Sequence, residues 1–514
     1  MKKAENASVK IIPLGGLEQI GMNITAIEYD DSIVVVDCGL SFPEEDMLGI
    51  DLVIPDVTYL KENLDKVKGF VITHGHEDHI GSIPYVLKDI NVPIYATKLT
   101  MGLIESKLKE HNMLKAVKRK VVRYGQSVTL GDFRVEFIRT NHSIADAAAL
   151  AIYSPAGIIV HTGDFKVDYT PVYGDPIDLQ RLGELGKKGV LALMCDSTNA
   201  LRPGFTMSER TVGATFEKIF NDNKNSRIII ATFASNVDRV QQIINSAVKY
   251  GRKVCVEGRS MVNIIEVAEE LDYLKIPEGT LIETDEMKNY TPEQIVLITT
   301  GSQGESMAAL SRMAANLHRK VSIQPGDCVV FSSTPIPGNE KSVAKVINEL
   351  GMKGAKVIFQ DTHVSGHACQ EEIKLIYSLV KPKYSIPVHG EYRHLVAQRD
   401  VTNIINPVIL IELNEIGNYN YCYIPNFNRY YFITDITVIR TGLFAISLMV
   451  DVLESFKTEI KNLSVILLNT QNVGTNNYLP SQVFRNNVKA KTDIINFPNG
   501  LNDSGEFILI TAGG

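Results

Sequence analysis

Short apolar runs of strand length alternate with amphipathic helical patterns along the first 399 residues. Several of these runs lead into Gly, Asp or His, where functional loops usually begin. The predicted strands are Ser32–Val36, Gly69–Ile72, Gly157–Val160, Val190–Met194, Arg227–Ala231, Val296–Thr299 and Cys328–Ser332. The predicted helices include Thr211–Asn221, Val237–Lys249 and Asn339–Leu350. This alternation predicts an α/β organisation.

The pattern changes near Arg399–Pro407, and all eleven histidines lie before residue 395. Beyond this junction, runs rich in aromatic and branched residues are separated by Asn and Gly, which favours strands and turns. We expect strands within Tyr421–Ile433 and Leu463–Leu468, and a helix around Met449–Leu463. Residues 400–514 are therefore predicted to form a separate strand-rich unit without a metal ligand or an acid–base group.

Composition indicates a folded protein. The 514 residues are 45% hydrophobic and 22% charged, with a net charge of −7. Six cysteines without clustered spacing favour a reducing cytosol over a disulfide scaffold. No apolar run approaches the ~20 residues of a membrane helix and the start lacks an apolar signal region, so we expect a cytoplasmic protein without membrane contact. The mild acidity disfavours a protein that coats nucleic acid by bulk charge, but permits a nuclease whose positive charge is local or supplied by metal ions.

The strongest chemical signal is a cluster of potential metal ligands directly after an apolar run. Residues Ile72–Gly81 read ITHGHEDHIG, which places His74, His76, Asp78 and His79 close together. Imidazole and carboxylate groups suit zinc or manganese. One ion cannot use all these donors together with candidates farther along the chain, so the spacing predicts two metal ions. The alternative, a polar helix start with incidental histidines, is disfavoured by this arrangement.

This string resembles the HxHxDH motif of the metallo-β-lactamase fold, and the resemblance implies further ligands downstream. The expected histidine after a strand is His142 in TNHSIADAA, and the expected aspartate closing a strand is Asp164 in IVHTGDFK. An early aspartate, Asp37 in VVVDCG, is expected to orient a ligand. Taken singly, each would be read as a cap or a core hydrogen-bonding group, but their order fits the family. His161 is expected to be a buried core or orienting histidine.

Three later motifs indicate the branch of this fold. Asp196 stands in MCDSTNA, His367 in THVSGHA and His389 in IPVHGEYRH. The order resembles the β-CASP branch, whose members act on nucleic acids and carry an inserted domain between the first and second of these motifs. The resemblance to the bacterial ribonuclease J family covers about residues 9–398, in LGGLEQIGMN, HTGDFKVDYTP, ATFASNVDRVQQ, GSQGESMAALSRM, SSTPIPGNE, HVSGHACQEE and PVHGEYRH.

The resemblance implies an αββα metallo-β-lactamase sandwich with an inserted β-CASP α/β domain, followed by an unrelated strand-rich C-terminal segment. The expected bounds are 1–205 and 346–399 for the two parts of the lactamase domain, 206–345 for the inserted domain and 400–514 for the tail. The tail does not match the family. It is either a fused segment that docks the nuclease on a partner or the product of a chimeric gene. Its segment Pro407–Leu413 is apolar enough to pair with the nuclease sheet or to remain within the tail.

The resemblance also assigns roles to single residues. One divalent metal ion is expected on His74, His76 and His142, a second on Asp78, His79 and His389, and Asp164 is expected to bridge them. Zinc is the expected metal, with manganese or magnesium as alternatives. Asp196 is expected to orient a neighbouring histidine, and His367 to act as general acid on the leaving oxygen.

A second set of residues resembles the family's nucleotide-phosphate pocket. Its members are Phe233, Ala234, Ser235, His363, Val364, Ser365, Gly366 and His367. A glycine loop of this kind offers backbone N–H groups and a hydroxyl to a phosphate, although HVSGH alone would be read as an ordinary turn. The pocket implies a preference for 5′-monophosphate ends and 5′-to-3′ trimming, since a triphosphate would be too bulky. The choice of RNA over DNA is implied by the resemblance alone. A protein distinguishes the two by contacts with the 2′-hydroxyl, and no residue of the sequence indicates such a contact.

The expected function is that of a metal-dependent ribonuclease with 5′-to-3′ exonuclease and endonuclease activity in RNA maturation and decay. RNA is the expected partner, together with a homo-oligomer or a related nuclease subunit. The alternative is a weakly active interaction subunit of an RNA-processing complex, which a degenerate ligand set would have favoured. A small-molecule hydrolase of the lactamase fold is disfavoured by the inserted segment.

Overall fold

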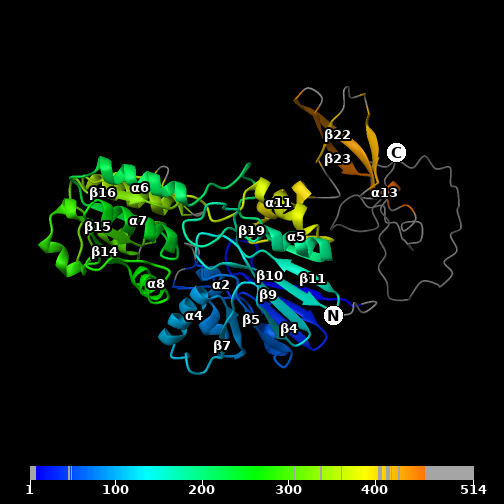
Figure 1. The fold of residues 1–514 in the computed structure, drawn as a ribbon, viewed down its shortest axis with the longest axis horizontal. Coiled ribbons are helices and arrows are strands. Elements are labelled where there is room, and N and C mark those ends of the chain that lie inside the picture. Colours follow the sequence, from blue (N-terminus) through cyan, green and yellow to red (C-terminus); the bar gives the residue numbers. More distant parts are fainter. Residues whose placement is uncertain are drawn as a thin grey trace, which may run out of the picture. The chain divides into compact units, whose positions relative to one another are not determined.

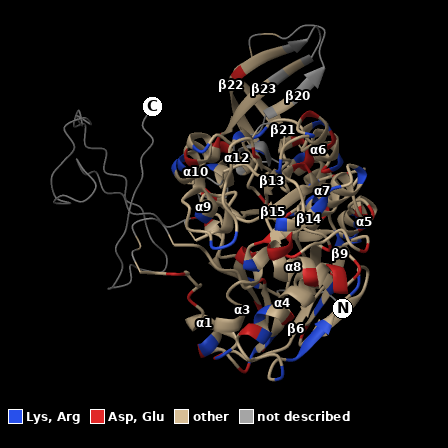
Figure 2. Ribbon diagram, turned by 90° about the vertical axis from the view of Figure 1, so that its left-hand side faces the viewer, with Lys and Arg blue, Asp and Glu red and all other residues tan. Residues whose placement is uncertain are grey.

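The computed structural model describes residues 7–43, 47, 49–305, 307–335, 339–359, 362–402, 408–412, 417, 419–425, 429–440, 443–455 and 457 (Figure 1). The chain divides into two compact units, residues 1–402 and 403–514, which are described separately. Basic and acidic residues are interspersed along the elements of the first unit, in keeping with the small net charge of −7 (Figure 2).

Two six-stranded sheets form the centre of the first unit. The first has the order β1-β3-β4-β5-β6-β7 and comprises β1 (Lys10–Gly15), β3 (Ile24–Tyr29), β4 (Ser32–Val36), β5 (Val67–Val71), β6 (Ile94–Ala96) and β7 (Arg119–Val121). The second has the order β18-β12-β11-β10-β9-β8 and comprises β8 (Ser127–Leu130), β9 (Phe133–Arg139), β10 (Ala148–Ser154), β11 (Gly157–His161), β12 (Val190–Asp196) and β18 (Tyr384–Val388). A short parallel pair joins β2 (Leu17–Glu18) to β19 (Gly390–Glu391).

Branched and aromatic side chains hold the two sheets face to face. Val34 and Val36 share one buried cluster with Phe137 and Leu150 of the other sheet, and each such burial contributes about 1.5–3 kcal/mol. Helices cover the outer faces: α1 (Thr58–Glu62), α2 (Glu77–Ile80), α3 (Ile83–Val86) and α4 (Lys98–Glu110) on the first sheet, and α5 (Leu179–Lys188), α11 (Gln370–Val380) and α12 (Tyr392–Thr402) on the second (Figure 1). This is the predicted αββα sandwich.

The inserted α/β domain is built on a five-stranded parallel sheet with the order β14-β15-β13-β16-β17. Its strands are β13 (Ile228–Ala231), β14 (Lys253–Glu257), β15 (Ile295–Thr299), β16 (Cys328–Phe331) and β17 (Lys356–Ile358). Its helices are α6 (Arg210–Asp222), α7 (Val237–Lys249), α8 (Arg259–Glu270), α9 (Ala309–Ala314) and α10 (Glu340–Met352). The sheet extends past residue 345 to β17, and the domain bounds given above stay a prediction.

All seven strands and three helices expected in this part of the chain are present, each within two residues of its predicted ends. Disagreements of this size are usual at element ends, where hydrogen bonding frays.

One antiparallel sheet, with the order β20-β23-β22-β21, forms the described part of the second unit. The expected strand region is divided between β21 (Tyr421–Ile424) and β22 (Arg429–Arg440). The apolar segment 407–413 supplies β20 (Val408–Glu412), which pairs with β23 (Leu443–Val450). The segment therefore completes a sheet within the tail.

The prediction of a helix around residues 449–463 is wrong for its first two residues. Met449 and Val450 complete β23, because they pair with Phe432 and Tyr431 of β22. A single short helix, α13 (Val452–Ser455), follows among the described residues. The strand expected at residues 463–468 lies outside the described residues.

We expect a chain that ends at Thr402 to remain soluble and to keep its thermal unfolding transition within about 3 °C. The tail buries its own apolar cluster around Tyr431, Ile446 and Leu448, and β20 pairs with β23 of the same unit. Among the described strands, none of the tail pairs with a sheet of the first unit, so no described strand edge should be newly exposed. Calorimetry of the truncated and full chains measures this, and aggregation of the truncated chain would contradict it.

Candidate active site

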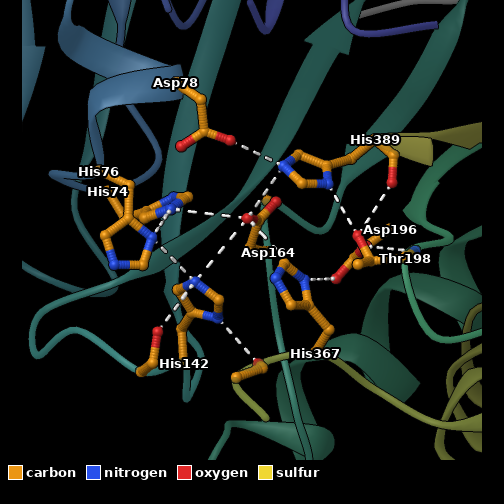
Figure 3. Close-up of polar contacts among 12 residues, drawn as sticks. His74, His76, Asp78, His142, Asp164, Asp196, Thr198, His367 and His389 are labelled. Carbon is orange, nitrogen blue, oxygen red and sulfur yellow. Dashed lines mark hydrogen bonds and ion pairs between the residues drawn. The ribbon is translucent and has the colours of Figure 1, made fainter. Parts of the chain in front are cut away.

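Three histidines and one aspartate meet where strands of the two sheets end (Figure 3). His74 and His76 follow β5, His142 follows β9, and Asp164 follows β11. His76 Nδ1 lies 3.0 Å from His74 Nε2 and 3.1 Å from His142 Nε2. Asp164 Oδ2 lies 3.7 Å from His74 Nε2 and from His142 Nε2. Segments that are distant in sequence thus direct four donor atoms at one point.

A second group of donors shares the Asp164 carboxylate. His79 Nε2 lies 3.3 Å and His389 Nε2 lies 3.4 Å from Asp164 Oδ2. Asp78 Oδ2 lies 3.0 Å from His389 Nε2 and 3.6 Å from His79 Nε2. Asp164 is therefore common to both groups (Figure 3).

The donor spacings and protonation states fit metal binding. Donors around a tetrahedral zinc ion lie about 3.3 Å apart, given bonds of about 2.0–2.1 Å, and the distances above are close to this value. Burial lowers the pKa of His74 and His142 well below its usual value, and that of His76 to about 4. These imidazoles are therefore neutral, as ligands must be. The cluster is a metal-binding site.

Charge is arranged differently in the second group. Burial would raise the pKa of Asp164, but the neighbouring His389 and His79 lower it well below its usual value. Burial would lower the pKa of His389, but Asp164 and Asp78 raise it to about 9. Metal binding to this group therefore displaces protons and weakens in acid.

One aspartate orients two of the histidines. His79 Nδ1 donates to Asp37 Oδ2 at 2.8 Å. His74 Nδ1 lies 3.0 Å from Thr73 Oγ1, whose hydroxyl donates in turn to Asp37 Oδ2 at 2.9 Å. Both rings therefore carry hydrogen on Nδ1 and turn Nε2 toward the site, as orienting hydrogen bonds do at metal centres. Asp37 takes the orienting role that the resemblance implies, whereas Thr73 was not predicted, although it directly precedes the ligand motif.

His142 and His389 are oriented by residues of the later sequence motifs. His142 Nδ1 donates to the Gly366 carbonyl at 2.8 Å. His389 Nδ1 lies 2.7 Å from Thr198 Oγ1, and Thr198 also donates to Asp196 Oδ1 at 2.8 Å. Thr198 was missed as well; its only sequence signal is its place two residues after Asp196 in MCDSTNA.

We expect Gly366→Ala to weaken metal binding about 10- to 100-fold, the usual effect of disturbing a residue that orients a ligand. A Cβ at this position would lie 2.6 Å from His142 Cε1 and 2.7 Å from Nδ1, so the ring must move. Competition with a chromogenic chelator measures the change. Gly351→Ala is the control, since a Cβ there meets nothing within 4 Å; equal affinities in the two variants would contradict the expectation.

His367 stands beside the metal-binding cluster without belonging to either group above. Its Nδ1 lies 2.8 Å from Asp196 Oδ2, and its side chain is 21% exposed. Burial would lower its pKa, but the charge and hydrogen bond of Asp196 raise it above the usual value. His367 is therefore an accessible imidazole whose protonated form is favoured by Asp196. His161 instead accepts the Gly163 N–H at 3.0 Å within the core.

The HVSGH segment borders the site through its side chains. Ser365 Oγ accepts hydrogen bonds from Asn199 Nδ2 at 2.8 Å and from the His367 N–H at 3.2 Å. The ring of Phe233 lies 6.5 Å from that of His363. Ala234 and Ser235 continue the same loop toward α7, and their contact with a phosphate stays a prediction.

A cavity of about 310 Å³ opens beside His142, with walls from the lactamase part and from the inserted domain. Thr140 and Lys166 line it from the first, Asp238 and Tyr273 from the second. Its size is at the lower end of the range for ligand sites.

No helix among the described residues combines the length and apolar character that crossing a bilayer requires.

Comparison with family models assigns three segments of the chain. Residues 20–221 match the metallo-β-lactamase superfamily. Residues 225–350 match the model described as ribonuclease J, β-CASP domain. Residues 355–402 match the Zn-dependent metallo-hydrolase RNA specificity domain.

Similar proteins carry related names. Ribonuclease J 1 of Streptococcus pyogenes is 52% identical over 388 residues, which cover 75% of this chain and 69% of that protein. Ribonuclease J of Helicobacter pylori is 48% identical, covering 78% of this chain and 58% of that protein. Ribonuclease J2 of Bacillus subtilis is 44% identical, covering 76% and 71%. The aligned region thus spans between 58% and 71% of these relatives.

A solved structure shares the fold at low identity. A protein of unknown function from Enterococcus faecalis V583 superposes with a TM-score of 0.56 at 18% identity, over 75% of this chain and 94% of that one. The family models and the relatives agree with the geometry of the site. The chain therefore belongs to the ribonuclease J family of metallo-β-lactamase and β-CASP ribonucleases.

Proposed function

We propose that the chain is a metal-dependent ribonuclease that hydrolyses phosphodiester bonds with two divalent metal ions, with zinc expected and manganese or magnesium as alternatives. The shared position of Asp164 supports this most directly, since its Oδ2 lies within 3.7 Å of donors from both groups. One carboxylate between two donor groups is the arrangement that a pair of metal ions requires.

The chain's own groups have distinct tasks in this proposal. His74, His76 and His142 would hold one ion and Asp78, His79 and His389 the other, with Asp164 common to both groups. When bound, the ions supply Lewis-acid activation of the attacking water and stabilise charge on the phosphate. His367 donates a proton to the leaving oxygen, because Asp196 raises its pKa and thereby favours the protonated form.

We assign the 5′ end of the substrate to the HVSGH segment. Ser365 Oγ accepts two hydrogen bonds, so its own proton is left for a phosphate oxygen. Phe233, Ala234 and Ser235 would form the facing wall. Gripping a 5′-monophosphate permits 5′-to-3′ trimming besides internal cleavage, whereas a triphosphate is too bulky. RNA as substrate, in maturation and decay, is supported by the names of the relatives and by the match at residues 355–402.

The alternative functions are less well supported. An interaction subunit with little activity does not need seven donors in two groups, the ligand atoms of each group within 4.8 Å of one another, and the chain has them. A small-molecule hydrolase has no use for the β-CASP domain matched at residues 225–350. A homo-oligomer or a related nuclease subunit as partner stays a prediction.

The decisive experiment is digestion of a 5′-monophosphorylated, end-labelled RNA by the full chain with added Zn²⁺ or Mn²⁺. We expect release of labelled mononucleotides, which His76→Ala abolishes. The matched control is His111→Ala, because His111 packs against Tyr85 away from the cluster. Failure of the unmodified chain to cleave with either metal would contradict the proposal.

Ser365→Ala should reduce trimming more than internal cleavage. A hydroxyl hydrogen bond to a charged oxygen contributes roughly 1.5–3 kcal/mol, or about 10- to 150-fold if fully expressed in the transition state. Only trimming depends on the gripped end, so cleavage of a circular RNA should be nearly unchanged. Ser378→Ala is the control, because the Ser378 hydroxyl donates to the Lys374 carbonyl within α11. Equal losses in both activities would argue against the pocket assignment.

A further inference from the structure

A buried arginine of the inserted domain holds the HVSGH segment in place. Arg239, on the first turn of α7, is 0% exposed. Its Nε and Nη2 donate to the carboxylate of Glu209 at 2.8 and 3.0 Å. Its Nη1 donates to the Ser332 carbonyl at 2.7 Å and lies 2.9 Å from His363 Nδ1, while Nη2 donates to the Val364 carbonyl at 3.4 Å. These contacts account for all five N–H groups of the guanidinium.

The contact with Arg239 determines which nitrogen of His363 carries hydrogen. A guanidinium has no acceptor and does not lose its proton in proteins, so His363 Nδ1 must be the acceptor. A neutral His363 then carries hydrogen on Nε2. Burial, followed by the charge of Arg239, lowers the pKa of His363 to about 3, which agrees with a neutral ring.

Partly exposed and buried residues alternate along the HVSGH segment. His363, Ser365 and His367 are partly exposed, whereas Thr362, Val364, Gly366 and Ala368 are buried. Residues 362–365 form no regular element and the chain bends at Gly366 and His367, so the alternation is one of exposure. His363 is therefore accessible in the same short segment as the hydroxyl of Ser365 and the ring of His367.

We propose that Arg239 is a positioning residue that fixes His363 as the Nε2–H tautomer, so that His363 and Ser365 offer two hydrogen-bond donors to a 5′-terminal phosphate. Arg239 itself does not touch the phosphate. This inference rests on the proposed function, because it concerns the same phosphate segment. It also links substrate-end recognition to the inserted domain, since Phe233, Ala234, Ser235 and Arg239 belong to one loop and helix start.

The tautomer is tested without any change to Arg239. Long-range ¹H–¹⁵N correlation spectra of the full chain labelled with ¹⁵N-histidine distinguish the two neutral tautomers from the imidazolium. The His363 signals are those that disappear in His363→Gln. We expect the Nε2–H form at neutral pH in the absence of RNA. An Nδ1–H form or an imidazolium would overturn the proposal, whatever the activity of the protein.

A double-mutant cycle tests the consequence for binding. Arg239→Lys keeps a positive charge opposite Glu209 but loses the fork that reaches His363. We expect it to raise the KM for 5′-monophosphorylated RNA about 10- to 150-fold, with circular RNA cleaved as before. In a His363→Gln background, the amide supplies a donor that needs no tautomer selection, so the same change should raise KM less than about threefold. Equal factors in both backgrounds would indicate a merely structural role and overturn the proposal.

The control is Arg259→Lys on α8, an exposed arginine expected to leave KM unchanged. If Arg239→Lys fails to fold, the tautomer spectrum still decides. If the unmodified chain trims no RNA, the proposed function fails, whereas the spectrum reports on His363 independently.

Discussion

Asp164→Asn should lower RNA cleavage by more than about 1000-fold, because metal ions supply several kcal/mol of charge stabilisation in the transition state. Asp164 Oδ2 is the atom that both donor groups share, and the side chain is 3% exposed. An amide of the same shape keeps the packing but removes the negative charge between two cations. Both sites should therefore lose affinity together, and neither should be refilled by raising the concentration of one metal.

Elemental analysis and thermal unfolding check this expectation. The unmodified chain, purified without chelator and offered zinc, should carry two metal ions, and the variant fewer than one. Asp175→Asn is the matched control, since its side chain is 74% exposed and pairs with Arg139. Retention of two ions and of cleavage by Asp164→Asn would contradict the bridging role, and fewer than one ion in the unmodified chain would contradict the two-metal account.

His367→Ala should reduce single-turnover cleavage about 10²- to 10⁴-fold, the usual contribution of a positioned general acid. Metal content should be unchanged, because His367 Nδ1 is bonded to Asp196 Oδ2 at 2.8 Å and lies farther, 3.9 Å, from Asp164 Oδ2. The loss should shrink for a substrate whose leaving group needs no proton, such as a p-nitrophenyl phosphodiester. An equal loss on both substrates would assign His367 to binding rather than to proton donation.

The pH profile provides a control for the acid. Asp196 raises the pKa of His367, so the protonated form is present below the raised value and is lost as pH increases through it. Asp196→Asn removes the carboxylate and lowers that pKa. The alkaline limb of the rate profile should therefore move to lower pH. A shift in the opposite direction would contradict the assignment.

Local sequence was sufficient for much of the fold and for the metal cluster. The strand Ser32–Val36 was predictable because four apolar residues in a row, Ile33–Val36, are typical of a strand buried on both faces. His74, His76, Asp78 and His79 were recognisable because four donors follow one strand. By contrast, a hydroxyl becomes an orienting group only when distant segments meet, as Thr198 and His389 do across 191 positions. Nothing in the local sequence distinguishes such a threonine from an ordinary one.

In the tail, a local pattern predicted the wrong element, because pairing with a distant strand decides the structure there. Met449 and Val450 favoured a helix by their local context, yet cross-strand pairing with β22 holds them in β23. Strand preference depends on neighbours across the sheet more than on the segment itself. Arg239 is a similar case inside the first unit, because its importance comes from Glu209, His363 and Val364, none of which lies near it in sequence.

The adjacency of Ser365 and Gly366 has a thermodynamic consequence. Gly366 accepts the hydrogen bond that orients His142, and the neighbouring Ser365 is the residue assigned to the phosphate. Under the proposed function, one short segment therefore serves both an RNA end and a metal ligand. Occupancy of the two is then linked: an RNA end that steadies the segment tightens metal binding, and the metal tightens end binding by the same factor.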